Sequence, residues 1–492
     1  MAAAATIVIV PCWASGHFMS MIAAGKRMVD ASGGALSLTV LVMQAPTPAK
    51  ASEVDAHVRR ESSSASGGLL DVRFLSLPAV EPPPTGSVAL EEFNFRYVQL
   101  HAPHVEEAIA GLALPVAAVV VDLFCMPLLD VAGHLAVPRH VYFASTGAFL
   151  ALMLRLPAIR DDLAVRLRDA DAEEGTVHVP GLPPVPLAYM PACLWSGGKM
   201  SSNYEWFEYY GRRLMDATGI ILNSSVQLER GVLAAIADGR CVPGRPAPTV
   251  HAIGPVVWFS PAGGEPQQPP HVCVRWLDTQ PPGSVVFLCF GSNGFLDEAQ
   301  VGEAAAGLER SGHRFLWVLR GAPAADPASP TDADLGAALP AGFQARTQAR
   351  GLVWPAWAPQ KEILAHPAVG GFVTHCGWNS ALESLWHGVP MAPWPLYAEQ
   401  HLNAFELASV MGVAVVMKVD RRRGNFVEAP ELERAVRALM DDGADEEGRK
   451  AREKAADMKA ACRKAVAEGG SSYVALRKLV RGISHGGVAP SP

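Results

Sequence analysis

Short apolar runs alternate with amphipathic patterns along most of the chain, as they do where strands and helices alternate. In the first half, runs rich in β-branched residues predict strands at Thr6–Pro11, Leu36–Met43, Val72–Leu77, Pro115–Val121 and His140–Phe143. A helix is predicted from Met19 to about Val29, and the Ala- and Ser-rich stretch Pro46–Gly68 is predicted as a surface excursion. Because several runs are apolar on both faces, we expect a parallel sheet covered by helices.

The composition changes between Trp258 and Pro270, where Pro, Gly and Gln replace the apolar periodicity. A second series follows, with predicted strands at Ser284–Phe290, Arg314–Arg320, Gly351–Trp354, Gly371–Thr374 and Val413–Met417 and predicted helices at Glu298–Ser311 and Ser380–Trp386. The charged, helical stretch Pro430–Lys464 is predicted as a solvated face.

These patterns predict an α/β chain built from two Rossmann-like, doubly wound parallel-sheet domains that face each other across a cleft. We expect an N-terminal domain at residues 1–255, an interdomain linker at 256–274 and a second domain at 275–470. Residues 471–492 are expected to form a C-terminal helix and tail that packs back on the N-terminal domain.

Composition and charge narrow the classes of function. The chain has 492 residues, of which 50% are hydrophobic and 18% charged, as is typical of a globular enzyme. With 41 Lys and Arg against 48 Asp and Glu, the formal net charge is -7, so we expect no nucleic-acid partner. The most apolar window, Val141 to Ile159, is interrupted by Ser145, Thr146, Gly147 and Arg155, so no membrane span is predicted.

The N-terminal stretch and the spacing of the cysteines indicate the cellular compartment. No Lys or Arg precedes Lys26, so the apolar start Ala2–Val10 is interpreted as a strand and not as a secretory signal. Among the eight cysteines the closest pair, Cys273 and Cys289, is sixteen positions apart, which excludes CxxC redox or zinc spacing and suits a reducing cytosol. We therefore expect a cytoplasmic protein, and we expect it to be a monomer.

The segment from Trp357 to Gln400 carries the richest chemistry. It predicts a strand, a tight turn at His375-Cys376-Gly377-Trp378, an N-cap at Asn379 and a helix from Ser380. A helix start after a glycine turn presents free N–H groups and the positive end of the helix dipole, which together bind anions. Because the segment holds one Lys, Lys361, and no Arg, we expect backbone and hydroxyl groups to hold a diphosphate there.

This segment, with its opening WAPQ, central HCGWNSALES and closing EQ, resembles the signature box of plant UDP-sugar-dependent glycosyltransferases that act on small secondary metabolites. The resemblance extends to PCWASGH near the start, VVVDLF around Asp122 and RWLDTQPPGSVVFLCFGS at Arg275–Ser292. It implies the two-domain GT-B fold and a UDP-sugar co-substrate, with no cofactor and no metal.

The resemblance also implies roles for individual residues in a donor site. The residues expected to bind the UDP-sugar are Trp357, Ala358 and Gln360 at the uridine, Ser292, His375, Asn379 and Ser380 at the diphosphate, Glu383 at the ribose, Trp378, Glu399 and Gln400 at the sugar, together with Gly377 and Tyr397. Family members that use UDP-glucuronate tend to have Arg in place of Trp378, and galactose users more often have His in place of Gln400. We therefore predict UDP-glucose, with another UDP-sugar as the alternative.

A second constellation, His17 with Asp122, occupies the family's catalytic positions. A base poised near neutral pH suits deprotonation of a phenol, and a carboxylate behind it would hold the imidazole tautomer and stabilise the imidazolium. We predict an inverting reaction in which His17 takes the acceptor proton while UDP leaves from the opposite face. The order Val121 then Asp122 resembles the arrangement that directs transfer to oxygen, and C-glucosylation stays as the alternative.

Aromatic residues suggest the acceptor. Phe18, Phe124, Phe143 and Trp195, with Phe149 and Trp206, are predicted to line a cleft for planar phenolics such as flavonoids or chalcones, although each could equally be ordinary core.

The sequence disfavours a DxD metal site and two other classes of protein. Asp169-Ala170-Asp171 and Asp332-Ala333-Asp334 imitate a DxD metal motif, but neither follows an apolar strand, so both are predicted as solvated loops. A nucleotide-linked oxidoreductase is disfavoured because the chain has no GxG, and a non-catalytic binding relative is disfavoured by the retained dyad and sugar motif.

Overall fold

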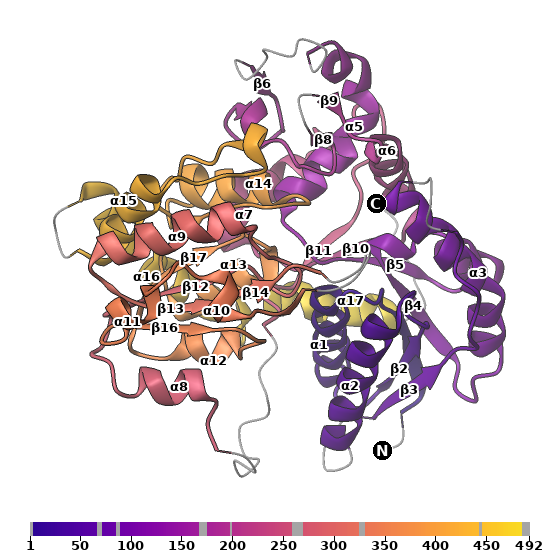
Figure 1. Ribbon diagram of the computed structural model, residues 1–492. Coiled ribbons are helices and arrows are strands. Elements are labelled where there is room, and N and C mark those ends of the chain that lie inside the picture. Colours follow the sequence, from indigo (N-terminus) through magenta and orange to yellow (C-terminus); the bar gives the residue numbers. More distant parts are fainter. Residues whose placement is uncertain are drawn as a thin grey trace.

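The computed structural model describes residues 3–65, 71–84, 89–166, 175–196, 199–257, 269–323, 330–441 and 445–484. It contains two parallel sheets that stand side by side, each covered by helices (Figure 1). The Asp169 motif lies outside the described residues, as do residues 258–268 of the predicted linker and 485–492 of the tail.

The first sheet has seven strands in the order β11-β10-β5-β4-β1-β2-β3, all paired in parallel. Its strands are β1 (Ala5–Val10), β2 (Leu36–Val42), β3 (Val72–Ser76), β4 (Val116–Asp122), β5 (Arg139–Phe143), β10 (Gly219–Leu222) and β11 (Val250–Ala252). The helices of this half are α1 (Ser15–Ala31), α2 (Pro48–Ala65), α3 (Leu90–Ala110), α4 (Leu128–His134), α5 (Gly147–Arg166), α6 (Tyr204–Arg213) and α7 (Val226–Ala237).

The second sheet has five parallel strands in the order β16-β13-β12-β17-β18. These are β12 (Val285–Cys289), β13 (Arg314–Val318), β16 (Gly351–Trp354), β17 (Val369–Thr374) and β18 (Met391–Pro393). Its helices are α8 (Val272–Leu277), α9 (Glu298–Ser311), α10 (Leu335–Ala338), α11 (Phe343–Thr347), α12 (Gln360–Ala365), α13 (Trp378–His387), α14 (Gln400–Phe405) and α15 (Ala429–Met440). Three short antiparallel ribbons complete the described strands: β6 (Thr176–Val177) with β7 (Val185–Pro186), β8 (Trp195–Ser196) with β9 (Lys199–Met200), and β14 (Arg320–Gly321) with β15 (Thr331–Asp332).

Both sheets are buried on both faces, which explains the apolar runs of the sequence. In β1, Val8 and Val10 pack on one side of the sheet, while Ile7 and Ile9 pack on the other beneath α1. In β12, Phe287 and Val286 likewise belong to cores on opposite faces. Each sheet therefore has an apolar core on both of its faces, and these four cores stabilise the two halves of the molecule.

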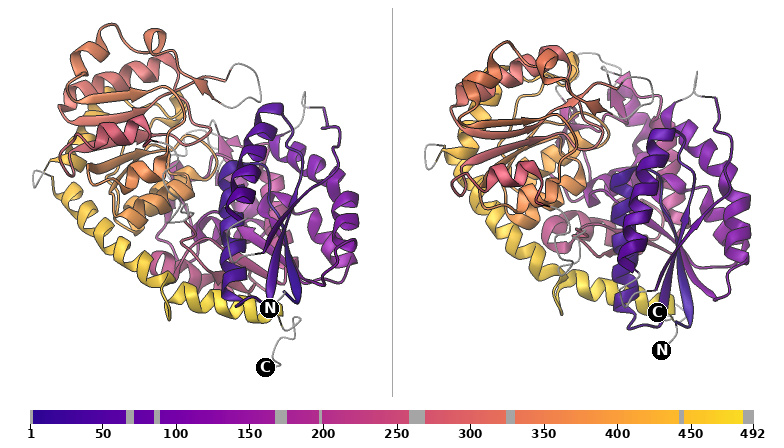
Figure 2. Two further views of the ribbon diagram at one scale, coloured as in Figure 1. Left: turned by 90° about the horizontal axis from the view of Figure 1, so that it is seen from below. Right: turned by 60° about the horizontal axis from the view of Figure 1, so that its bottom comes forward.

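Two C-terminal helices join the halves. The long helix α16 (Glu446–Val466) packs against α13 of the second half and α7 of the first, and α17 (Ser471–Ser484) packs against α1 and β11. In Figure 2 these yellow helices run along one side of the molecule from the second half to the first. The small buried side chains Ala451, Ala455 and Ala465 allow α16 to approach closely, so the prediction of a merely solvated face is wrong for this helix.

Three predicted elements differ from the structure. The first helix begins at Ser15 and not at Met19, which places His17 in its first turn. The excursion Pro46–Gly68 is mostly the helix α2, whose Ala, Glu and Arg residues are good helix formers. The run Val413–Met417 forms only an isolated bridge, between Ala414 and Met391. Its apolar residues other than the exposed Val416 pack in the core instead.

Candidate active site

Both predicted sites lie at the point where the strand order of a sheet reverses. In the first sheet β1 and β4 are neighbours, and the chain leaves them in opposite directions, toward β2 and toward β5. His17 follows β1 and Asp122 ends β4. In the second sheet β12 and β17 are such neighbours, and Ser292 and the turn at His375 follow them. Open α/β sheets bind ligands in crevices at these positions.

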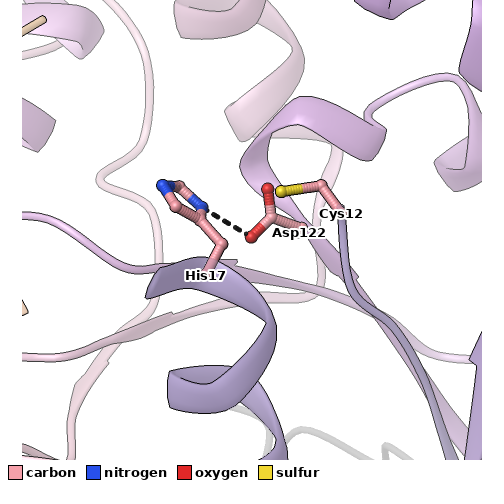
Figure 3. A group of neighbouring side chains, drawn as sticks. All are labelled: Cys12, His17 and Asp122. Atoms are coloured by element: carbon pink, nitrogen blue, oxygen red, sulfur yellow. Dashed lines mark hydrogen bonds and ion pairs between the residues drawn. The ribbon is translucent and has the colours of Figure 1, made fainter. Parts of the chain in front are cut away.

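The structure brings His17 and Asp122 together. The imidazole Nδ1 lies 2.8 Å from Asp122 Oδ2 (Figure 3). Asp122 Oδ1 accepts a hydrogen bond of 3.0 Å from the Phe124 N–H. The His17 side chain is 26% exposed whereas Asp122 is fully buried. With Nδ1–H donating to the carboxylate, the Nε2 atom is the one left to accept a proton from an acceptor.

Opposing effects act on the pKa of His17. Burial lowers this pKa, but the charge and hydrogen bond of Asp122, with smaller contributions from Glu399 and Glu91, raise it by more, so the net shift is upward. On the other side of the carboxylate, burial and the Asp122 charge raise the pKa of the Cys12 thiol well above its ordinary value. Cys12 therefore stays protonated.

Cys12, His17 and Asp122 are also the one group among the described residues whose ligand atoms, within 4.8 Å of one another, could surround a metal ion. A metal there would have to displace both the His17–Asp122 hydrogen bond and the thiol proton, so this donor set fits a proton-transfer dyad better.

A cavity of about 550 Å³ lies beside the dyad and contains seven of the predicted donor residues. These are Ser292, Trp357, Ala358, Gln360, Asn379, Ser380 and Glu383. The cavity also reaches Ser15 and Gly16, directly before His17, so it extends toward the predicted catalytic base. Trp357 is 63% exposed, which leaves its ring face available for stacking.

Inside this cavity one side chain organises two others. The Gln360 amide donates from Nε2 to Ser380 Oγ at 2.9 Å and to Glu383 Oε2 at 2.7 Å. Burial raises the pKa of Glu383 to about 7, opposed by the Gln360 hydrogen bond and the Lys361 charge. The carboxyl is thus held in place while Oε1 remains for a polar ligand group.

The turn after β17 packs tightly around His375. A Cβ atom added to Gly291 or Gly377 would come within 2.6 or 2.5 Å of His375 Nε2, so both positions require glycine. Burial lowers the pKa of His375 to about 4, and the ring is therefore neutral. It can donate a hydrogen bond but supplies no positive charge to a leaving diphosphate. The helix α13 begins at Trp378 with Gly377 as its cap, so the prediction of Asn379 as the N-cap is wrong.

Several expected donor residues bond across the two halves. Asn379 Nδ2 donates to the Gly16 carbonyl at 2.9 Å, and Trp378 Nε1 donates to the Asn223 carbonyl at 2.7 Å. Glu399 Oε1 accepts from Ser145 Oγ at 2.8 Å. These groups link the halves at the same place where a sugar is expected.

Two further predicted donor residues lie near the start of α14: Tyr397 just before this helix and Gln400 as its first residue. Gln400 is buried, and its Oε1 accepts from the N–H groups of Leu396 and Tyr397 at 2.9 and 3.0 Å. This fixes the amide so that only its NH₂ group is free to meet a ligand. Burial raises the pKa of Tyr397 to about 12, so its hydroxyl is neutral.

The predicted acceptor aromatics separate into two groups. Phe18 and Phe143 are 1% and 0% exposed and belong to the cores on either side of the first sheet, and Phe149 is also buried. The Phe124 ring, by contrast, lies 5.2 Å from that of His17 and is partly exposed. Trp195 is 9% exposed and belongs to the same core as Phe143, with the Arg421 guanidinium 4.9 Å from its ring centre.

Sequence reasoning missed the positive lining of the donor cavity. Arg60 reaches it from α2, Arg320 from β14, and Lys361 from α12. His57 of α2 also lines the cavity, but burial lowers its pKa and so disfavours a positive charge there. The basic residues within Pro46–Gly68 were the available signal, but their approach to the second half depends on the tertiary structure. Asp334 caps α10 through the N–H groups of Gly336 and Ala337, which gives the rejected DxD motif a structural role.

Known proteins resemble this chain in sequence and in fold. Residues 260–448 match the family model of UDP-glucoronosyl and UDP-glucosyl transferases. The chain is 57% identical to a malvidin galactosylase, UGT88C3, of Oryza sativa subsp. japonica over 97% of both chains. It is 36% identical to an anthocyanidin 5,3-O-glucosyltransferase of a Rosa hybrid cultivar over 96% of this chain and 98% of that one.

The chain belongs to the plant family-1 UDP-sugar-dependent glycosyltransferases. A crystal structure of Medicago truncatula UGT71G1 with UDP-glucose has a TM-score of 0.82 and 30% identity to this glycosyltransferase, over 98% of each chain. The predicted GT-B fold is thereby confirmed, as is the prediction of an enzyme that uses a UDP-sugar as co-substrate. Among the described residues of the glycosyltransferase, no helix is both long and apolar enough to cross a membrane.

We expect Asp122→Asn to lower the pKa of His17, because the carboxylate is the main opponent of burial. Without the carboxylate the effect of burial dominates, so the pKa of His17 should be lower in the variant than in the wild-type enzyme. NMR titration of the selectively labelled histidines measures the shift. Asp130→Asn, which alters an exposed carboxylate paired with Arg213, is the matched control and should leave the His17 pKa in place. An unchanged pKa in Asp122→Asn would contradict this electrostatic account.

Proposed function

We propose that this glycosyltransferase moves glucose from UDP-glucose, with inversion, to a hydroxyl group of a flavonoid-type phenol in the cytoplasm. We assign the acceptor to the domain at residues 1–255 and the donor to the domain at residues 275–470, with the protein acting as a monomer and without a metal. The observation that carries the proposal is the His17–Asp122 dyad at the mouth of the donor cavity.

The dyad supports general-base catalysis. His17 Nε2 takes the acceptor proton as the oxygen attacks the anomeric carbon, and Asp122 stabilises the imidazolium that forms. The O–H bond and the bond from the anomeric carbon to UDP break while the new glycosidic bond forms, and attack opposite the leaving group inverts the anomeric centre.

The donor cavity supports departure of UDP without a metal. The N-terminus of α13 offers free N–H groups and Ser380, and Arg60, Arg320 and Lys361 place positive charge in the same cavity. Trp357 suits uracil, and Glu383 Oε1 suits a ribose hydroxyl. Ser292, Ala358, Gln360, His375, Gly377, Asn379 and Tyr397 complete the donor residues that we propose.

The choice of hexose rests on the residues that we assign to the sugar: Trp378, Glu399 and Gln400. The fixed NH₂ group of Gln400 supports glucose, by the resemblance of this position to glucose users. Galactose is the second candidate, because the rice relative at 57% identity is named as a galactosylase. The names of the rice and rose relatives, malvidin and anthocyanidin, support a flavonoid acceptor.

The linkage is proposed to be O-glycosidic. Val121 is buried in the sheet and Asp122 meets His17 from the opposite side of the strand, so the base lies where it can remove a hydroxyl proton. Carbon attack would need the ring to turn an ortho carbon toward the anomeric centre. For the aromatic acceptor, Phe124 is the wall residue that we retain, since Phe18, Phe143 and Trp195 are core residues.

His17→Ala should lower the rate of transfer by about 10²–10⁴-fold, the usual cost of losing a general base, while UDP still binds. Turnover by UDP release and UDP affinity by calorimetry measure the two effects separately. His178→Ala, at an exposed position away from the dyad, is the control and should keep its turnover. A His17→Ala enzyme that keeps a third of wild-type turnover would remove His17 from the mechanism.

A mixture of ¹³C-labelled UDP-glucose and unlabelled UDP-galactose should give mainly the labelled product with a flavonoid or anthocyanidin acceptor. Mass spectrometry reads the ratio directly, because the two products then differ in mass. Gln400→His should move the ratio toward galactose, since it replaces a fixed NH₂ donor. Predominant galactose in the wild-type product would overturn the sugar assignment alone. A product that withstands strong acid would overturn the O-linkage.

EDTA should leave the transfer rate unchanged, because helix N–H groups and cationic side chains carry the leaving-group charge. The measurement is initial velocity with and without chelator, followed by addition of magnesium or manganese. Turnover that vanishes in EDTA and returns with either ion would show that a metal ion, and not these protein groups, stabilises the charge of the leaving group.

A further inference from the structure

One arginine of the second half holds a loop of the first half, residues 188–195, which we call the bridging loop. Arg421 donates from Nη1 to the main-chain carbonyls of Ala188 and Met190, at 2.7 and 2.9 Å, and from Nη2 to that of Trp195 at 3.1 Å. Its guanidinium group also lies 4.9 Å from the ring centre of the buried Trp195. A planar guanidinium can donate to several fixed acceptors at once, which a lysine ammonium cannot do in the same geometry.

The turn that carries Arg421 is held by its own hydrogen bonds. It is the 3-10 helix Arg421–Arg423, and its N-cap Asp420 accepts from the N–H groups of the second and third residues of this helix, at 3.0 and 3.3 Å. The main chains of Asp420 and Phe426 exchange two further bonds, of 2.8 and 3.0 Å, which close the turn. Removal of the Arg421 side chain should therefore leave the turn itself folded.

The same turn also supports the segment 397–400, which contains residues proposed to bind the sugar. Asn425 Nδ2 donates to the Leu396 carbonyl at 2.8 Å, and Asn425 Oδ1 lies 2.9 Å from His401 Nε2. The main-chain carbonyl of Asn425 accepts from Trp394 Nε1 at 3.0 Å. These bonds lie on both sides of the segment 397–400, so one turn fixes this segment as well as the bridging loop.

The bridging loop and the segment 397–400 are joined directly. The N–H of Ala192 donates to the carbonyl of Ala398 at 2.7 Å, and Ala398 directly precedes Glu399. Ala398 has a φ of 52°, a left-handed conformation that a residue with a Cβ keeps only where its surroundings hold it. The position of Glu399 therefore depends on the bridging loop, and the position of that loop depends on Arg421.

We propose that Arg421 is a positioning residue for the hexose: by holding the bridging loop, it fixes Glu399 and Gln400 relative to both halves of the molecule. This inference rests on the proposed assignment of Glu399 and Gln400 to the sugar. The residues proposed for the uridine, such as Trp357, line a cavity whose described lining includes neither Arg421 nor the bridging loop. Arg421 therefore acts on the hexose and not on UDP.

Binding of UDP and of UDP-hexoses, measured by calorimetry without an acceptor, tests this separation. Arg421→Ala should leave the Kd of UDP unchanged. It should raise by about tenfold the Kd of whichever of UDP-glucose and UDP-galactose the wild-type enzyme binds more tightly, as expected when about one hydrogen bond to the sugar is lost. Arg421→Lys keeps the charge without the planar fork and should show most of the same loss.

Arg423→Ala is the matched control, because the Arg423 guanidinium lies 3.9 Å from the ring centre of Phe426 and pairs with the exposed Glu428 in its own half. It should keep both affinities. Equal weakening of UDP and UDP-hexose in Arg421→Ala would show a structural role and overturn the inference. Wild-type affinity for the UDP-hexose in Arg421→Lys would also overturn it, and this variant decides the question if Arg421→Ala fails to fold.

Turnover with a flavonoid or anthocyanidin acceptor separates the inference from the proposed function. Arg421→Ala should lower kcat by up to about 10²-fold, the usual cost of displacing a reacting group by about 1 Å. Unchanged kcat together with unchanged UDP-hexose affinity would overturn the inference and leave the proposed transfer standing. Selective weakening of UDP-hexose binding in Arg421→Ala, with no transfer to these acceptors by the wild-type enzyme, would support the inference and overturn the proposed acceptor class.

Discussion

The parallel pairing of β1 with β4 is the constraint on which the catalytic chemistry depends. Val10 lies opposite Val121, so the two strands end at the same level, and the next polar residues of each chain segment meet at one edge of the sheet. The hydrogen bond between His17 and Asp122 follows from that register. A one-residue slip would turn Asp122 to the other face of the sheet and leave the imidazole without its partner.

The second sheet obeys the same rule, and the two edges face each other. Ser292 follows β12, and the glycine-flanked His375 follows β17, so the proposed diphosphate site also lies at the strand ends of this half. The hydrogen bonds from Asn379 to Gly16 and from Trp378 to Asn223 join the edges, while α16 and α17 join the halves along another side. The donor cavity takes residues from both halves, so their relative position determines how close a bound sugar lies to His17.

Charge is distributed unevenly across this cleft. The cavity assigned to the donor has Arg60, Arg320 and Lys361 in its lining, which suits a diphosphate. The surroundings of His17 instead contain Asp122, Glu399 and Glu91, which hold the pKa of the base upward. The proposed base and the proposed diphosphate site therefore lie in surroundings of opposite charge.

The sequence by itself determined the two parallel-sheet halves, because strands buried on both faces must be apolar throughout, and that pattern is visible in one dimension. It also singled out His17, Asp122 and most residues that line the proposed donor cavity, because their motifs follow strands and resemble those of the family. The sequence did not show that the Pro46–Gly68 stretch is a helix whose Arg60 and His57 complete the donor cavity, since these residues come from the other half of the molecule. Nor did it distinguish the core residues Phe18 and Phe143 from Phe124 beside the base, since burial depends on which face of each element meets a neighbour. The contacts of Arg421 with the bridging loop were equally invisible, because only the tertiary structure decides which groups a side chain meets.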